Sequence, residues 1–415
     1  MRILGISCYF HDASAALIED GILIAAAEEE RFTRKKHDYE FPHNAINFCL
    51  EQAGIEGQDL DYVVFFEKPF VKFDRLLKTA IQGFPKTYKM FVQSMRTWLF
   101  DKLWIKSLIA RSVGIDPKRV LFSEHHLSHA ASAYFCSPFD EAAVLTFDGV
   151  GEWATTTMGV GKSSNLTLIR EQHFPHSIGL LYSAFTAFLG FEVNEGEYKV
   201  MGMAPYGTPR YVDKVWKIVR QSDDGSYWLD PKYFAFQYSA KHSYSSRLVE
   251  LFGAPRDSKI PFFTDTSGFP SYYGRRPRNF DEQCRYNQHY ADIAASIQLV
   301  TEELVLQLAR ELHRETGLKR LCMAGGVALN SVANSRILRE TPFEELYVQP
   351  SAGDGGTRSA RRCSHGTVRS ETTAAGSSWI TPTGERLMRR TIFAPLSTRQ
   401  ASRQNTLTTT PGLLT

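Results

Sequence analysis

The first thirty residues alternate short apolar runs with polar turns. The apolar runs cover residues 3–8, 15–19 and 22–27, and the dipeptide Asp20-Gly21 separates the second run from the third. An Asp-Gly pair between two apolar runs is a strong hairpin signal, because both residues tolerate a left-handed backbone. The pattern therefore predicts three consecutive antiparallel strands at the start of the chain.

Helical and strand patterns then alternate along the chain. The predicted elements are a helix over 42–53, a strand over 62–66, a basic and aromatic helical stretch over 85–111, strands over 120–122 and 143–147, and a short helix beginning near His126. Antiparallel strands followed by helix-linked strands are typical of an α/β fold. Their order resembles the ribonuclease-H-like lobe of the actin, sugar-kinase and chaperone superfamily.

A second lobe of the same kind is predicted downstream. Apolar residues there repeat at steps of four and three, as on one face of a long buried helix: Ile293, Ile297, Val300, Leu304, Leu308 and Leu312. A strand over 320–323 and the glycine turn Ala324-Gly325-Gly326 follow. We therefore expect duplicated lobes, at about 1–175 and 176–357, that close on a nucleotide between them.

Two segments depart from this pattern. Residues 225–280 are rich in Tyr, Phe, Pro and Gly, and we interpret them as an irregular insertion that either decorates the surface or lines a pocket for an acceptor. Residues 358–415 are rich in Thr and Ser, and their few apolar positions follow neither a helical nor a strand period. We expect a disordered tail there, or sequence read out of frame.

Charge and cysteine content exclude several classes of protein. The net charge is +3, and residues 358–415 hold nine Arg and two acids, 9 − 2 = +7, which leaves −4 for residues 1–357. That balance argues against a nucleic-acid partner. The six cysteines include no CxxC pair, which favours a reducing cytoplasm over a disulfide framework or a zinc knuckle.

We also expect no membrane partner. No run of 18 apolar residues occurs in the chain, and no signal-peptide pattern forms at its start. The basic and aromatic stretch over 85–111 is the one segment that resembles a membrane-surface helix. Packing of its aromatic face against the first lobe is the interpretation we favour.

Three of the twelve histidines lie within five positions. His125 and His129 are four apart, so a helix points both from one face toward a single metal ion, whereas His126 faces elsewhere. Two acids in glycine-flanked turns, Asp148 and Asp354, complete a set of two nitrogen and two oxygen ligands. Such a set suits iron, manganese or zinc. The alternative is a histidine pair that only packs within its own helix.

A glycine turn and an early histidine are further candidates. Gly325 and Gly326 follow a strand and open a segment that reaches Asn330, an arrangement in which backbone amides approach an anion or a ribose. A purely structural tight turn is an equal alternative. His11 stands in the first predicted hairpin, where it is either a general base or a hydrogen-bonded turn residue.

Several long motifs together resemble one family. They are MRILGISCYFHDASAALIEDG, AAAEEERFTRKKH, EHHLSHAASAYFCSPF, LTFDGVGEWATTT, EGEYKVMGMAPYG and AGGVALNSVAN. In this order they closely resemble the N-terminal domain of NodU-type O-carbamoyltransferases, over about residues 1–357. The metal ligands that the resemblance implies are His125, His129, Asp148 and Asp354, with iron as the first choice of metal. His11 is the residue implied to activate the acceptor hydroxyl, and the adenylate site is implied to include Lys199, Gly325, Gly326 and Asn330.

The resemblance also implies a reaction. A carbamoyl group passes from carbamoyl adenylate, which is made from carbamoyl phosphate and ATP, to a hydroxyl of a small molecule such as an antibiotic, a sugar or a nodulation factor. In the family a YrdC-like domain that makes the adenylate follows, whereas this sequence departs from the pattern at Arg358. We therefore expect a frameshifted or truncated chain that lacks that domain.

Three alternatives stay open at this point. The chain is similar to the tRNA threonylcarbamoyl transferase, although the FHD and EEERF motifs and the −4 balance disfavour that function. A sugar kinase on the same fold has no use for the HxxxH pair. An inactive remnant is the third alternative, because of the aberrant tail. The sequence does not decide the oligomeric state, so a homodimer also stays open.

Overall fold

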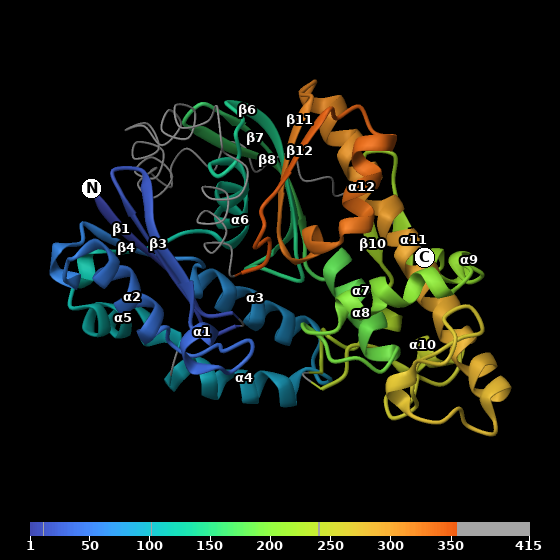
Figure 1. Cartoon of the computed structure of the whole chain (residues 1–415). Helices are drawn as coiled ribbons and strands as arrows, with labels where there is room; N and C mark the ends of the chain where they lie inside the picture. The colour runs from blue at the N-terminus through green and yellow to red at the C-terminus, as the bar shows by residue number, and fades with distance from the viewer. Residues whose placement is uncertain (11, 101, 240, 355–415) are drawn as a thin grey trace, which may run out of the picture.

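The computed structural model describes residues 1–10, 12–100, 102–239 and 241–354, and two five-stranded sheets form the centres of two lobes (Figure 1). In the first sheet β3 (Ile22–Glu28), β2 (Ser14–Glu19) and β1 (Arg2–Ser7) are antiparallel neighbours. β4 (Tyr62–Phe65) and β5 (Val120–Phe122) continue the sheet in parallel from β1. The three predicted opening strands are confirmed.

The second sheet repeats this topology. β8 (Asn165–His173), β7 (Ala154–Lys162) and β6 (Glu141–Phe147) are antiparallel neighbours. β11 (Arg320–Ala324) and β12 (Glu345–Val348) continue in parallel from β6. Both sheets therefore run third, second, first, fourth and fifth strand in chain order, which confirms the α/β fold with duplicated lobes.

Helices on the first sheet bury one of its faces. They include α2 (His43–Ala53) and α5 (Ile105–Val113), whose residues Ile46 and Ile109 join the core with Leu4 and Leu17. The carboxylate of Glu29 accepts hydrogen bonds from the backbone amides of Asn44 and Ala45, and so satisfies donors at the start of α2. Short α1 (Glu30–Thr33) follows β3, and α3 (Pro69–Gln82) and α4 (Tyr88–Phe100) pack together below the lobe in Figure 1.

The second sheet is covered on both faces. α6 (His125–Tyr134) packs on one face, and the other carries the large core that contains α7 (Ile178–Phe188) and the 37-residue α11 (Phe280–Thr316). The remaining elements of this lobe are α8 (Glu197–Met203), α9 (Val212–Trp216), β9 (Val219–Gln221), β10 (Tyr227–Leu229), α10 (Ser246–Phe252) and α12 (Ser331–Glu340). The long helix ends at Gly317, whose φ of 68° is the left-handed conformation that glycine adopts without strain.

The expected boundary between the lobes, near residue 175, is wrong. β6, β7 and β8 end by His173, yet they pair with β11 and β12 in the second sheet. The pairing of β6 with β11 joins segments about 180 residues apart, and no local pattern in the sequence reports it. The second lobe therefore already includes α6 and β6.

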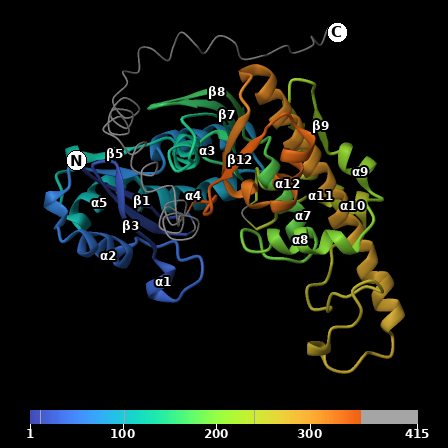
Figure 2. The same cartoon turned by 45° about the horizontal axis from the view of Figure 1, so that its top comes forward.

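The expectation of an irregular insertion over 225–280 is wrong for its first half. Tyr227, Phe234, Leu248 and Phe252 are buried in the main core of the second lobe. Residues 253–279 hold a 3-10 turn, and Phe263 forms a small separate cluster with neighbours at the start of α11. Figure 2 shows this segment extending away from the lobe.

The helical stretch predicted over 85–111 is divided between α4 and α5. Ile105 and Ile109 of α5 are buried in the first core, whereas Trp104 in the same stretch is 62% exposed. The packing of the aromatic face against that lobe therefore stays a prediction. Among the described residues, no helix combines the length and the apolar character needed to cross a bilayer. The expectations for residues 358–415 lie outside the described residues.

The core of the second lobe provides a stability test. Leu304 lies on α11 with none of its surface exposed, so Leu304→Ala should lower the free energy of unfolding by about 2–5 kcal/mol, through lost apolar contact and the cavity left behind. Leu338 on α12 is 47% exposed, and Leu338→Ala is the matched control. Urea denaturation of both variants measures the difference, and equal losses would contradict the assigned core.

Candidate functional site

The parallel strands of the second sheet bring distant residues to one edge. β6, β11 and β12 run in the same direction, so their carboxyl ends meet. Asp148 follows β6 directly, the Gly325-Gly326 turn follows β11, and Asp354 lies in the loop after β12. This edge is where an α/β sheet presents its ligand-binding residues.

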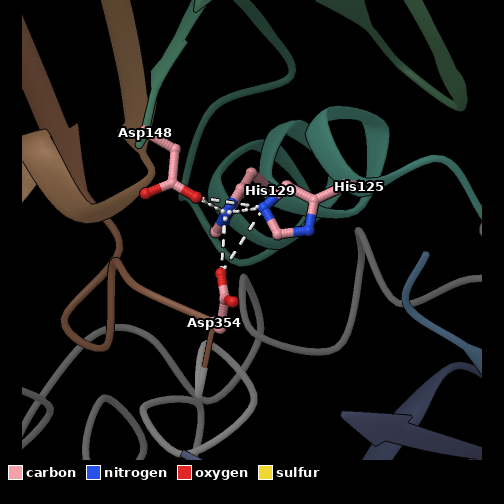
Figure 3. A group of neighbouring side chains, drawn as sticks. All are labelled: His125, His129, Asp148 and Asp354. Atoms are coloured by element: carbon pink, nitrogen blue, oxygen red, sulfur yellow. Dashed lines mark hydrogen bonds and ion pairs between the residues drawn. The ribbon is translucent and has the colours of Figure 1, made fainter. Parts of the chain in front are cut away.

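Helix α6 completes the site from the facing side. Its small residues Ala130 and Ala133 are fully buried against the sheet and let the helix approach closely. His125 and His129 occupy successive turns of this helix and point toward the strand ends (Figure 3). His126 points away and bonds through Nδ1 to the Thr146 hydroxyl at 2.7 Å, as the spacing predicted.

Four side chains converge at this point (Figure 3). His125 Nε2 lies 3.0 Å from Asp148 Oδ2, 3.1 Å from His129 Nε2 and 3.5 Å from Asp354 Oδ1. His129 Nε2 lies 3.5 Å from Asp148 Oδ2 and 3.3 Å from Asp354 Oδ1. All four residues are buried.

These separations fit a shared metal ion. Tetrahedral bonds of about 2.0–2.1 Å place neighbouring ligand atoms about 3.3–3.4 Å apart, and octahedral bonds of that length about 2.9 Å apart. The observed range is 3.0–3.5 Å. The structure thus brings together the four residues that the sequence singled out, and their role as ligands stays a prediction.

The ionisable groups of the site shift the pKa values of one another. Burial lowers the pKa of His129, but hydrogen bonds and attraction to the carboxylates of Asp148 and Asp354 prevail and raise it to about 10. Burial raises the pKa of Asp148, yet its hydrogen bonds to His125 and His129 prevail and hold it well below the usual range. Burial, with repulsion from His125 and His129, holds the pKa of His126 well below its ordinary value. The two carboxylates therefore require a positive charge between them.

The glycine turn packs directly against Asp148. The Gly326 amide donates to Asp148 Oδ1 at 3.2 Å, leaving Oδ2 to face the histidines. Gly325 has a φ of +95°, and a Cβ there would stand 2.2 Å from the carbonyl oxygen of Phe147. The observed contacts match the tight-turn alternative, and a contact of these glycines with a nucleotide stays a prediction.

Glu152 is a buried residue that the sequence analysis missed. Its carboxylate accepts hydrogen bonds from the backbone amide of His125, at 3.0 and 3.1 Å, and from that of Lys68 at 2.8 Å. A carboxylate at a helix N-terminus is favourable because it satisfies free amides and the helix dipole. Glu152 therefore holds the first histidine in place. Its position four residues after Asp148 in a glycine-rich turn was the available signal.

The other predicted ligand-binding residues lie apart from this centre. Asn330 caps α12 through the Ala333 amide and exchanges hydrogen bonds with the Gln298 side chain. Lys199 is exposed on α8, with Nζ 5.7 Å from the centre of the Tyr198 ring. Neither placement tests a contact with a nucleotide.

His11 lies outside the described residues, but its neighbour Asp12 is placed. Asp12 Oδ1 lies 2.7 Å from His37 Nδ1, and the carboxylate of Glu30 accepts the His37 amide at 3.1 Å. This half-buried group joins the FHD motif to the EEERF motif. The hydrogen bonds among the three residues account for their arrangement.

Comparison with known proteins decides the family. A family model described as Carbamoyltransferase N-terminus matches residues 2–360. The chain belongs to this family. Among its relatives, an uncharacterized protein of Synechocystis sp. is 48% identical over 363 residues, covering 86% of this chain and 55% of that protein. Nodulation protein NolNO of Sinorhizobium fredii is 32% identical over 359 residues, covering 84% of this chain and 45% of that protein.

The chain spans about half the length of the curated relatives it matches. Among solved structures, component A of (R)-2-hydroxyglutaryl-CoA dehydratase from Acidaminococcus fermentans has a TM-score of 0.40 at 13% identity, and covers 86% of this chain and 95% of that chain. So low a TM-score adds nothing to the strand order described above.

The contact between Gly151 and His125 gives a test of the site. A Cβ at Gly151 would stand 2.9–3.1 Å from atoms of the His125 side chain, so Gly151→Ala should displace that imidazole and weaken Zn²⁺ binding at least tenfold. Gly202→Ala is the control, because a Cβ there meets nothing within 4 Å. Competition with a chromogenic chelator measures both affinities, and equal affinities would contradict the placement of His125.

Proposed function

We propose that this chain is an O-carbamoyltransferase domain that moves a carbamoyl group from carbamoyl adenylate to a hydroxyl of a small molecule. The observation that carries the proposal is the convergence of two imidazoles and two carboxylates within 3.0–3.5 Å, in a chain of the carbamoyltransferase family. Several relatives are nodulation proteins, which supports a small hydroxylated acceptor of the nodulation-factor, sugar or antibiotic type. Cytoplasmic activity fits the five described cysteines, which are all free thiols.

A divalent ion is part of the proposal. His125, His129, Asp148 and Asp354 would hold iron, manganese or zinc, because two nitrogen and two oxygen donors suit each of these metals. When bound, the ion supplies positive charge for the phosphate oxygens of the leaving group. The chain's part is to keep the four donors dry and fixed, which burial, Glu152 and the Gly326 amide accomplish.

His11 is the proposed general base. It takes the proton from the acceptor hydroxyl while that oxygen attacks the carbamoyl carbon, the carbon–oxygen bond to the phosphate breaks, and AMP leaves. The preceding residue, Phe10, supports this role, because its ring centre lies 5.0 Å from Lys72 Nζ on α3. Lys72 pairs with Glu67, and the adjacent Phe66 ring lies 5.4 Å from the His125 ring.

The adenylate is proposed to lie between the lobes, with its phosphate toward the metal centre. Lys199, Gly325, Gly326 and Asn330 are proposed to line its site, as the family resemblance implies. Carbamoyl phosphate and ATP are the proposed sources of the adenylate, and no nucleic-acid or membrane partner is proposed. ATP and carbamoyl phosphate therefore act upstream of the step that this chain carries out.

Loss of a histidine ligand tests the metal. His129→Ala should reduce bound metal after purification to below a tenth of the wild-type content and leave the fold intact, because the site closes an edge of the sheet and lies outside its core. His173 is an exposed histidine paired with Glu171, so His173→Ala is the matched control. Elemental analysis by mass spectrometry gives the contents. Wild-type occupancy in the His129 variant would overturn the assignment.

Substitution of His11 tests the base. His11→Ala should slow carbamoyl transfer from preformed carbamoyl adenylate to a polyol acceptor by roughly 10²–10⁴-fold, and leave AMP binding unchanged, because proton abstraction acts in the transition state. Chromatography of AMP and of the carbamoylated acceptor gives the rate, and calorimetry gives the AMP affinity. An unchanged rate would return His11 to a structural role in the turn.

A further inference from the structure

Arg75 on α3 is buried and has no hydrogen-bonding partner among the described residues. Its residue exposure is 7%, and it donates no hydrogen bond to any described residue. Its Nε is fully enclosed, and the guanidinium carbon lies 5.1 Å above the Phe174 ring. A guanidinium has five N–H donors, so burial without acceptors is costly.

Nearby carboxylates are engaged with other groups. Glu67 pairs with Lys72 at 2.5 Å, and Glu124 pairs with Lys68 at 3.0 Å. Glu152 accepts the backbone amides at the start of α6 and α3, as described above. Burial lowers the pKa of Arg75 to about 10, while attraction to Glu67 and Glu152 opposes that loss. Arg75 is therefore charged at neutral pH and has no anion within hydrogen-bonding distance among the described residues.

The turn that leads into α3, the helix of Arg75, packs against the His125 end of α6. The turn between β4 and α3 runs along the first turn of α6, where the Ser128 hydroxyl donates to the carbonyl of Phe66 at 3.1 Å. The Phe66 ring contacts His125, and the carboxylate of Glu152 joins this turn to the His125 amide. Glu152 thus accepts the amide of the first histidine, and its charge also acts on Arg75.

We propose that Arg75 binds the phosphate group of a ligand, on the α3 side of the metal centre. This inference rests on the proposed function, which brings a phosphate-bearing substrate to that centre. Arginine suits the role, because its planar fork donates two parallel hydrogen bonds to a phosphate and its charge survives burial. The phosphate belongs either to an adenylate or to free phosphate and its carbamoyl ester. The competing role is a structural contact of the guanidinium with Phe174.

Replacement of the guanidinium tests the proposal. Arg75→Met keeps the length and the contact with Phe174 but removes the charge, and replacing a buried charge by an apolar group of similar volume is often neutral for stability. Calorimetry on the full chain with metal content matched should show AMP and inorganic phosphate bound about ten- to hundredfold more weakly by the variant, with adenosine binding unchanged. If the variant binds both AMP and phosphate more weakly, or AMP alone, the ligand of Arg75 is the phosphate group of the adenylate. If only phosphate binding is weakened, the ligand of Arg75 is free phosphate or its carbamoyl ester.

Two further variants keep the result decisive. Lys78→Met makes the same change of charge one turn later on α3, at an exposed lysine paired with Asp74, and should bind both probes as the wild type does. Arg75→Lys keeps the charge without the fork and should recover only part of the affinity. Wild-type affinities in Arg75→Met, equal losses in Lys78→Met, or no binding of either probe by the wild type would each overturn the proposal. Binding is measured without turnover, so a chain that binds AMP through Arg75 yet transfers no carbamoyl group would refute the proposed function alone.

Discussion

Two buried carboxylates facing two imidazoles are the constraint on which the rest of the site depends. Asp148 and Asp354 approach the same pair of nitrogen atoms, and the Asp354 side chain has no exposed surface. Like charges in such a place are tolerated only when a cation lies between them. The protein supplies a proton on His129 or accepts a metal ion, and both choices demand the same geometry. The order of β6, β11 and β12 satisfies that demand, because parallel strands bring their carboxyl ends together.

Close approach of backbone to side chain maintains this geometry. Gly151 leaves room for His125, and Gly326 donates its amide to Asp148, so each ligand is held from a neighbouring turn. Ser177 adds a hydroxyl that donates to the carbonyl of Asp148. Outer contacts of this kind orient the ligands of metal sites and tune their affinity. The two glycines therefore position His125 and Asp148, and an approach of Gly325 and Gly326 to a nucleotide stays a prediction.

Local signals predicted much of this arrangement. The HxxxH spacing was sufficient for His125 and His129, because helical periodicity alone places residues four apart on one face. Asp148 was predictable from its position at the end of an apolar strand. The boundary between the lobes was not predictable, because the pairing of β6 with β11 is non-local. β8 gave no further signal, because it alternates exposed and half-buried residues as an edge strand does. Glu152 and Arg75 were missed for a related reason, since their importance comes from partners on other elements.

The site draws its parts from both lobes, and this has a consequence for how it works. The second lobe provides the four metal-binding candidates, while the first provides the β4–α3 turn, whose Phe66 ring contacts His125. Ion pairs join the lobes elsewhere as well, since the Glu195 carboxylate lies 3.7 Å from Lys36 Nζ and 3.8 Å from His37 Nε2. Exposed or half-exposed pairs of this kind contribute little energy and are screened by salt. The hydrogen bonds from the amides of Lys68 and His125 to the buried Glu152 carboxylate are thus the firmer link, because they join the start of α3 to the start of α6. A change in the angle between the lobes would have to break those bonds, and it would move the guanidinium of Arg75 relative to the histidines.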